Sequence, residues 1–242
     1  MNQTDILESQ SLWYKYKTKV WVEETPQTST VHNIMRTLRS IHNVNPLAYI
    51  SVPITSGKIY YELKLKYPEK GNTELIKEVI DHNYHLGWKM INAIIKRNKC
   101  SVLYPADLTP AHQKWEQEHF QALWLSIIAE KCTELHLCKG WEFSNGGVEE
   151  FTHVMQLRLG VPQHPQLIFL NTKENEKKSR KRMRSIKTYD HAGKEISLQD
   201  GLVAVERSLS WLKENGFISE KLENCQQILM WTKEKIKEGF YQ

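Results

Sequence analysis

The chain has 242 residues, of which 40% are hydrophobic, 10% aromatic and 25% charged. This composition is typical of a globular protein with a sizeable core, and it excludes a chain that is disordered throughout. The longest mainly apolar stretch, residues 124–129, is far shorter than the roughly 20 residues of a membrane-spanning helix, so we expect no membrane partner. The first residues lack the features of a secretory signal, and the four Cys show no CxxC spacing. We therefore expect a cytoplasmic protein with reduced thiols.

The net charge of +5 comes from one segment of the chain. Residues 173–187 hold eight Lys or Arg and two Glu, a local charge of +6, so the other residues sum to −1. A solvated surface loop is the simplest interpretation of such a run. Binding of a nucleic acid or of a protein partner through this basic segment is the alternative.

The first 45 residues form an N-terminal extension with weak structural signals. Residues 12–22 alternate aromatic or apolar side chains with Lys, a pattern typical of an edge strand. Pro26 ends that pattern, and the Thr and Ser residues that follow it favour the start of a helix over residues 28–41.

From residue 47 onward, short apolar runs alternate with helical segments. Pro53 and Pro105 stop the first two runs, as expected for strands that end in loops. In chain order the pattern predicts a strand over 47–52, an ambiguous insertion over 60–71, a helix over 73–96 with a break near Gly87, a strand over 100–104, a helix over 109–131, a strand over 135–138, a helix over 147–159, a strand over 166–170, and two amphipathic helices over 198–215 and 220–237.

Strands that alternate with helices predict an α/β fold with a doubly wound parallel sheet, Rossmann-like or flavodoxin-like. The two last helices predict a C-terminal helical pair that packs on the core or on another subunit. The expected organisation is an N-terminal extension, a core, a basic segment and a C-terminal helical extension, over residues 1–45, 46–172, 173–187 and 188–242.

The loop over residues 140–147 is the richest of the loops that follow the predicted strands. Ligands of open parallel sheets bind beyond the carboxyl ends of the strands. Ser144 is a natural helix N-cap, and Gly146 and Gly147 let a ligand approach the N–H groups that open the helix. A tight strand-to-helix turn without a ligand is the alternative interpretation of this loop.

The helix that follows this loop places its two glutamates on different sides. Glu149 falls with His153 and Gln156 on a polar face. Glu150 falls on a partly apolar side, one turn below the Gly-rich loop, where a carboxylate needs a partner or a function. A structural pairing with a Lys, Arg or Tyr is the alternative to a role in catalysis.

Two segments resemble motifs of one enzyme superfamily. Residues 140–150, GWEFSNGGVEE, and residues 49–55, YISVPIT, are similar to the GWE-x-S-x-G loop and the Y-x-S-G-P-I-T strand of the nucleoside 2-deoxyribosyltransferase-like superfamily. The element S-x-G-x-x-x-E is shared with the 2′-deoxynucleoside 5′-phosphate N-hydrolases. The resemblance covers about residues 47–170, with both motifs on the expected strands and in the expected order.

The resemblance implies chemistry at the N-glycosidic bond of a nucleoside, a nucleotide or NAD. Glu150 would attack the anomeric carbon, and water or a second base would resolve the covalent glycosyl-enzyme. It also implies a homo-oligomer, and the sequence indicates neither a cofactor nor a metal site. The residues implied to contact the substrate are Tyr49, Ser51, Pro53, Ile54, Thr55, Ser56, Trp141, Ser144, Gly146 and Gly147.

The chain departs from the family pattern at two places. Val52 stands where the family strand has Gly, and the helix before the third strand has no Asp. The nearest polar residues are the candidate acid–base substitutes Glu116, Glu118 and His119. A leaving group that needs no proton, such as the nicotinamide of NAD, tolerates the loss of an acid better than an ordinary nucleobase does.

Two further functions stay open on the sequence alone. A non-catalytic nucleotide sensor on the same fold is one, because such domains with helical extensions resemble effectors of bacterial anti-phage systems. A partner-binding scaffold built on the basic segment 173–187 is the other.

Overall fold

The structure is a computed structural model. It describes residues 33, 34, 37, 46–97, 100–107, 115–160 and 185–238. The three described residues of the predicted helix over 28–41 are helical. The predicted edge strand over 12–22 and the predicted strand over 166–170 lie outside the described residues.

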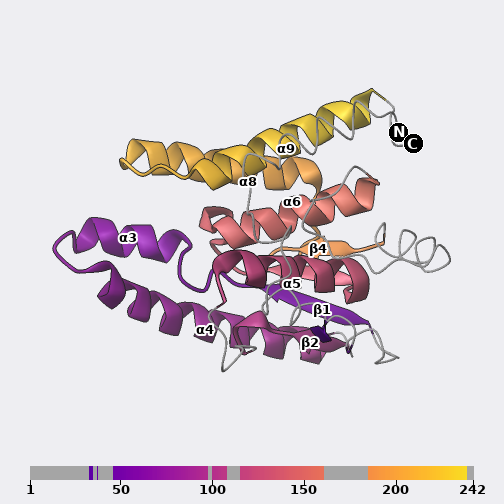
Figure 1. The fold of residues 1–242 in the computed structure, drawn as a ribbon, viewed down its shortest axis with the longest axis horizontal. Helices are drawn as coiled ribbons and strands as arrows, with labels where there is room; N and C mark the ends of the chain where they lie inside the picture. Colours follow the sequence, from indigo (N-terminus) through magenta and orange to yellow (C-terminus); the bar gives the residue numbers. More distant parts are fainter. Residues whose placement is uncertain are drawn as a thin grey trace.

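Four parallel strands form the sheet, in the order β2-β1-β3-β4. Their bounds are β1 Leu47–Ser51, β2 Ser101–Leu103, β3 Glu134–Leu137 and β4 Lys187–Tyr189. In register, Tyr49 of β1 lies between Leu103 of β2 and Leu135 of β3. Helices flank this all-parallel sheet, so the predicted α/β doubly wound fold is confirmed (Figure 1).

Strand β4 differs from the expected organisation of the chain. It pairs with β3, with Lys187 opposite Glu134 and Thr188 opposite Leu135. It therefore crosses the predicted boundary between the basic segment 173–187 and the C-terminal extension. Only Thr188 of its three residues is buried, so no apolar run marks this strand in the sequence.

The two faces of the sheet are covered by different helices. Ala48 and Ile50 of β1 pack with Ile91 and Ile94 of α4 (Asn72–Arg97) on one face. Tyr49, whose side chain alternates to the other face, belongs to the larger core cluster. That cluster includes residues of α5 (Gln117–Lys131), α6 (Asn145–Leu159), α8 (Leu198–Glu214) and α9 (Glu220–Lys237). In Figure 1, α8 and α9 form an outer layer over α6.

Helix α6 is enclosed between the sheet and this outer layer. Every residue from Gly147 to Leu157 is buried. The expected polar face with Glu149, His153 and Gln156 is therefore buried as well, because α9 packs on α6. The C-terminal helical pair is thus part of the same hydrophobic core.

Three helices differ from the predictions. Helix α3 (Lys58–Lys66) begins two residues before the ambiguous insertion over 60–71 and covers its first part. Helix α4 continues through Gly87, where a break was expected, and a Cβ there would meet Tyr104 Oη at 2.4 Å, so this Gly serves close packing. Helix α5 begins at Gln117 instead of residue 109, because Trp115 and Glu116 before it are not helical; residues 108–114 lie outside the description.

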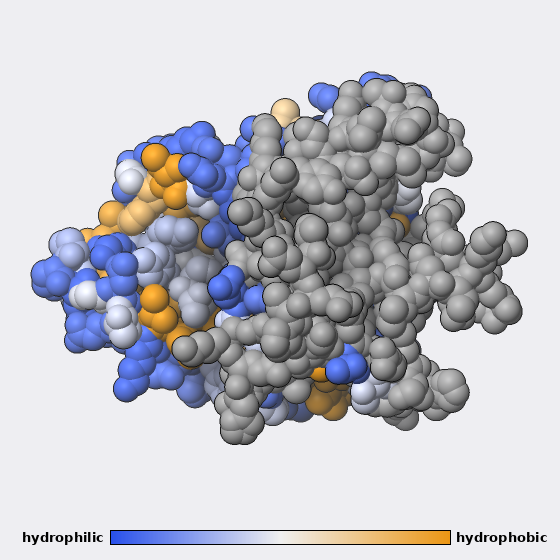
Figure 2. Space-filling view, in the orientation of Figure 1, coloured by the Kyte–Doolittle hydropathy of each residue, from blue (hydrophilic) through white to orange (hydrophobic). Residues whose placement is uncertain are grey.

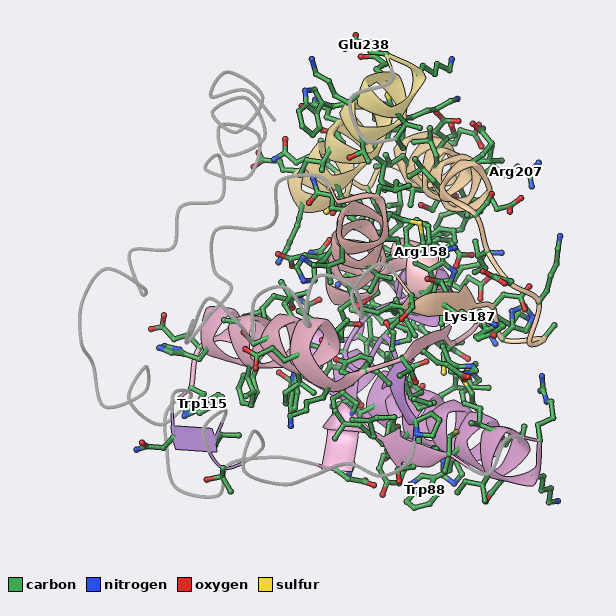
Figure 3. All side chains as sticks on the ribbon, turned by 90° about the vertical axis from the view of Figure 1, so that its right-hand side faces the viewer. Trp88, Trp115, Arg158, Lys187, Arg207 and Glu238 are labelled. Carbon is green, nitrogen blue, oxygen red and sulfur yellow. The ribbon has the colours of Figure 1, made fainter. Side chains whose placement is uncertain are left out.

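The described surface is mainly hydrophilic on the face shown in Figure 2, with small hydrophobic patches between charged residues. Figure 3 places Trp88 on the outer side of α4 and Arg207 on the outer side of α8. Among the described residues, no helix is both long and apolar enough to cross a membrane.

Candidate functional site

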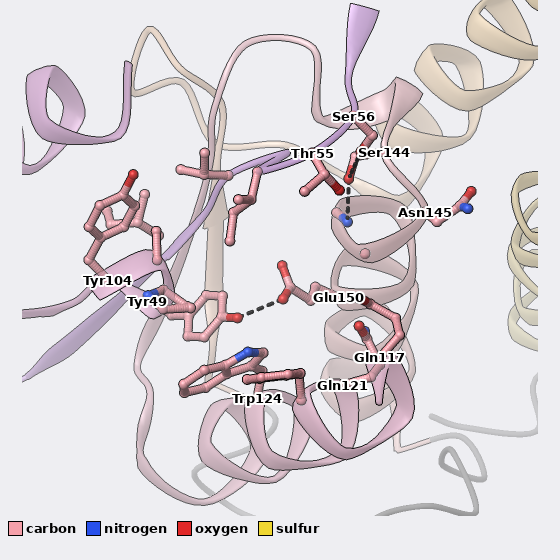
Figure 4. A pocket seen from close by; sticks show the side chains of 18 of the residues that line it. Tyr49, Thr55, Ser56, Tyr104, Gln117, Gln121, Trp124, Ser144, Asn145 and Glu150 are labelled. Atoms are coloured by element: carbon pink, nitrogen blue, oxygen red, sulfur yellow. Dashed lines mark hydrogen bonds between the residues drawn. The ribbon is translucent and has the colours of Figure 1, made fainter. Parts of the chain in front are cut away.

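A pocket of about 620 Å³ opens at the carboxyl ends of β1 and β2. The loops after these strands, one side of α5 and the first turns of α6 and α9 form its walls. Figure 4 shows the Glu150 carboxyl group inside the pocket, with Tyr49 and Trp124 on one side and Ser56 and Ser144 on the other. The residues that line it are Tyr49, Ile50, Val52, Ile54, Thr55, Ser56, Tyr104, Pro105, Ala106, Gln117, Phe120, Gln121, Trp124, Ser144, Asn145, Gly146, Gly147, Glu150 and Lys221.

Glu150 is a buried acid held by a buried phenol. Only 7% of Glu150 is exposed, and Tyr49 Oη donates a hydrogen bond of 2.6 Å to Glu150 Oε1. Tyr49 comes from the centre of β1 and Glu150 from the second turn of α6, so the parallel topology brings the two together. A charge-assisted hydrogen bond of this length holds one carboxyl oxygen of Glu150 in place and so fixes the orientation of the carboxyl group.

The protein environment of Glu150 raises the pKa of its carboxyl group towards neutral pH. Burial raises the pKa of Glu150 from its usual 4.5 to about 7, because the charged form loses its hydration. The hydroxyl groups of Ser51 and Tyr49 act against this shift of the pKa; Glu149 raises it further and Lys221 lowers it. Burial and the neighbouring Glu150 raise the pKa of Tyr49 well above its usual value, so this phenol stays protonated and donates.

The start of α6 forms the polar side of the pocket. Ser144 caps the helix, and its Oγ accepts a hydrogen bond of 3.4 Å from the Gly147 N–H. Ser56 Oγ donates to Ser144 Oγ at 3.2 Å, which ties the loop after β1 to this helix. A Cβ at Gly147 would meet the Trp141 carbonyl oxygen at 2.9 Å, so the turn requires Gly there. Unpaired N–H groups at such a helix start favour a negative charge or a hydroxyl.

Asn83 of α4 holds the loop after β1 in place. It is 1% exposed, and its Nδ2 donates to the carbonyl oxygens of Pro53 and of Ser56, the latter at 3.1 Å. Gly57 closes the loop with φ 85°, in the left-handed region that favours Gly. The role of Asn83 was not predictable from the sequence, because no local pattern indicates the partner of a polar residue on the inner side of a helix.

Eight of the eleven residues that the resemblance implies at the site line the pocket. They are Tyr49, Ile54, Thr55, Ser56, Ser144, Gly146, Gly147 and Glu150. Ser51 and Pro53 are buried and do not line it; the Ser51 hydroxyl lies beside Glu150 and lowers its pKa. Trp141 is 5% exposed, packs on Phe151 with ring centroids 4.9 Å apart, and lies outside the pocket, so it belongs to the core.

Of the three candidate acid–base substitutes, the two with described side chains, Glu116 and His119, do not line the pocket. Glu116 is the N-cap of α5, and its N–H donates to His119 Nδ1 at 3.1 Å, so these two residues cap the helix. The Glu118 side chain lies outside the description. Gln117 and Gln121 are the polar residues that α5 contributes instead, and Glu150 is the only carboxyl group among the described residues that line the pocket.

Sequence reasoning missed the aromatic wall and a lysine. Gln117, Phe120, Gln121 and Trp124 line the pocket from one side of α5, and their spacing of three and four residues was a usable signal. Lys221 reaches the pocket from α9, far along the chain from the motifs. No local pattern signals such a contact, because the packing of α9 on α6 creates it.

Comparisons with protein-family models, with curated proteins and with solved structures found no match for this chain. Any function proposed for this chain therefore depends on the geometry of the pocket.

Proposed function

We propose that the protein cleaves or transfers at the N-glycosidic bond of a nucleotide or NAD-like dinucleotide, with Glu150 as the nucleophile. The observation that carries this proposal is the Glu150 carboxyl group, which is buried, ionisable near neutral pH and held by Tyr49 inside a pocket. A carboxyl group with a perturbed pKa inside a cleft is a candidate for a functional group. A pocket of this volume suits a small organic ligand.

In the proposed first step, the ionised Glu150 attacks the anomeric carbon. Tyr49 donates to Oε1, so the second oxygen forms the new C–O bond while the C–N bond breaks and its electron pair stays on the leaving nitrogen. In the second step, water attacks the same carbon, the C–O bond to Glu150 breaks, and the water proton passes to solvent. This double displacement retains the configuration of the sugar.

The composition of the pocket favours a leaving group that departs without a proton. Glu150 is the only carboxyl group among the described lining residues, so these residues offer no second carboxyl group to protonate a neutral nucleobase. General acid catalysis is worth about 10²–10⁴-fold in rate. The pyridinium ring of an NAD-like dinucleotide instead becomes neutral when it takes the electron pair.

The two sides of the pocket suit the two ends of such a ligand. Trp124, Phe120 and Tyr104 supply aromatic surface for a planar ring. The N–H groups at the start of α6 and the hydroxyl groups of Ser56 and Ser144 suit a ribose or a phosphate. In Figure 4, Glu150 lies between the aromatic side of the pocket and the side formed by Ser56 and Ser144.

A mass-spectrometric assay tests this function. The purified protein is incubated with a mixture of nucleosides, nucleotides and NAD, and free bases are measured over time. We expect the wild type to release base, Glu150→Gln to lose at least about 10³-fold of that rate, and Glu234→Gln, which changes an exposed acid of α9, to keep it. Equal release by wild type and Glu150→Gln would contradict the proposal.

A non-catalytic nucleotide sensor is the second candidate. The presence of one carboxyl group instead of two among the described lining residues is the observation that favours it. This candidate predicts that wild type binds a nucleotide, measured by calorimetry, but forms no product after long incubation at high protein concentration.

A further inference from the structure

One cation reaches the pocket from outside the region of the family resemblance. Lys221 lies in the first turn of α9 and is the only Lys or Arg among the described residues that line the pocket. Its Nζ lies 2.5 Å from Glu149 Oε2. The Lys221 side chain is 26% exposed and that of Glu149 only 4%, so the pair joins a buried acid to a cation at the wall of the cavity.

A second contact fixes the start of α9 against the start of α6. Ser219 caps α9 and accepts from the Leu222 N–H at 3.4 Å. The same Ser219 Oγ donates to Asn145 Oδ1 at 2.8 Å, and Asn145 itself lines the pocket. Lys221 is therefore held near the N–H groups that open α6.

The chemistry of an ammonium group allows it to serve Glu149 and a ligand together. A Lys ammonium group has three N–H donors, and Glu149 is one of the partners of Lys221. A buried carboxylate is costly without a partner, so Glu149 keeps Lys221 at this position. The positive end of the α6 dipole lies at the same end of the pocket, and the two favour the same sign of ligand charge.

We propose that Lys221 is a specificity-determining residue that makes the pocket select a phosphorylated nucleoside over a neutral one, with Glu149 as its positioning residue. This inference rests on the proposed function, because it takes the ligand to be a nucleoside derivative. It assigns the discrimination to the C-terminal helix, which lies outside the motif-bearing core.

Calorimetry on the full chain tests the proposal. It measures the affinity for adenosine 5′-monophosphate and for adenosine, so the readout is binding and not catalytic activity. We expect the wild type to bind the monophosphate at least about tenfold more tightly, and Lys221→Met to lose this preference while its affinity for adenosine stays unchanged. Lys213→Met is the matched control, because Lys213 is a lysine of α8 that pairs with Glu223 and does not line the pocket.

A double variant guards against misfolding. Lys221→Met leaves Glu149 buried without its cation, so Lys221→Met/Glu149→Gln removes both charges; it should fold and still lack the preference. Lys221→Arg should restore the preference in part. Equal affinity of the wild type for the two ligands, no binding of either, or a preference that survives in the double variant would overturn the proposal. A preference for the monophosphate that depends on Lys221 in a protein without turnover would support it and contradict only the proposed function.

Discussion

At the scale of single residues, Glu150 is a carboxyl group whose ionisation the fold disfavours. Its pKa is raised to about 7, mainly because the side chain is buried. The hydrogen bond from Tyr49 compensates only part of this cost. Proteins keep buried ionisable groups that lower stability mainly where the charge serves a function. The raised pKa of Glu150 therefore supports the role that we propose for it.

This conflict predicts a pH-dependent gain in stability for Glu150→Gln. The pKa of Glu150 is higher in the folded protein than its usual 4.5, so its contribution to stability is full below about pH 4.5 and is lost as the pH rises through about 7. A pKa shift of one unit corresponds to about 1.4 kcal/mol. We therefore expect the free energy of unfolding of Glu150→Gln to exceed that of the wild type by up to about 3 kcal/mol at pH 8 and by little at pH 5. Urea unfolding at both pH values measures the difference, with the exposed-acid variant Glu234→Gln as the control. A difference that does not change with pH would contradict the assigned pKa.

At the scale of elements, the strand-to-helix connections set the shape of the pocket. Asn83 of α4 holds the loop after β1 by a hydrogen bond to the Ser56 carbonyl oxygen. The Ser56 hydroxyl joins the same loop to Ser144 at the start of α6. The start of α6 is fixed by the Ser144 cap and by α9 through Ser219. The pocket is thus built from loops that are tied to packed helices, which keeps its polar groups in place.

Asn83→Ala should loosen the loop after β1. The change leaves the carbonyl oxygens of Pro53 and Ser56 without their donor, so we expect a loss of about 1–3 kcal/mol in stability and weaker ligand binding. Asn92→Ala, an exposed Asn of the same helix, is the matched control. Thermal unfolding and calorimetry measure both effects. Unchanged affinity in a folded Asn83→Ala protein would show that the loop does not shape the binding site.

The elements with strong local patterns were predictable. The apolar run at the position of β1 and the Ser144 cap with its two Gly predicted the central strand, the start of α6 and the direction of Glu150. Strand β4 was not predictable, because a three-residue strand with one buried side chain has no periodic pattern. The start of α5 was misplaced, because Glu116 caps it through His119 instead of through a Ser or Thr.

At the scale of the whole molecule, the C-terminal helices complete the core and the pocket together. A Cβ at Gly201 of α8 would meet the Phe151 ring of α6 at 2.0 Å, so this Gly lets the ring pack directly against the α8 backbone. Lys221 then reaches the pocket from α9. The sequence could predict the amphipathic pair but not this contact, because the identity of the buried neighbour depends on tertiary packing. The homo-oligomer and the partners of residues 173–187 stay predictions.

The most direct measurement of the central claim is the capture of the covalent intermediate. The protein is mixed with NAD, quenched in acid within milliseconds to seconds, digested and analysed by mass spectrometry. We expect a glycosyl adduct on the peptide that contains Glu150, which disappears at long times as water resolves it and is absent from Glu150→Gln. Release of nicotinamide at the wild-type rate by Glu150→Gln, or an adduct on another residue, would contradict the claim that Glu150 is the nucleophile.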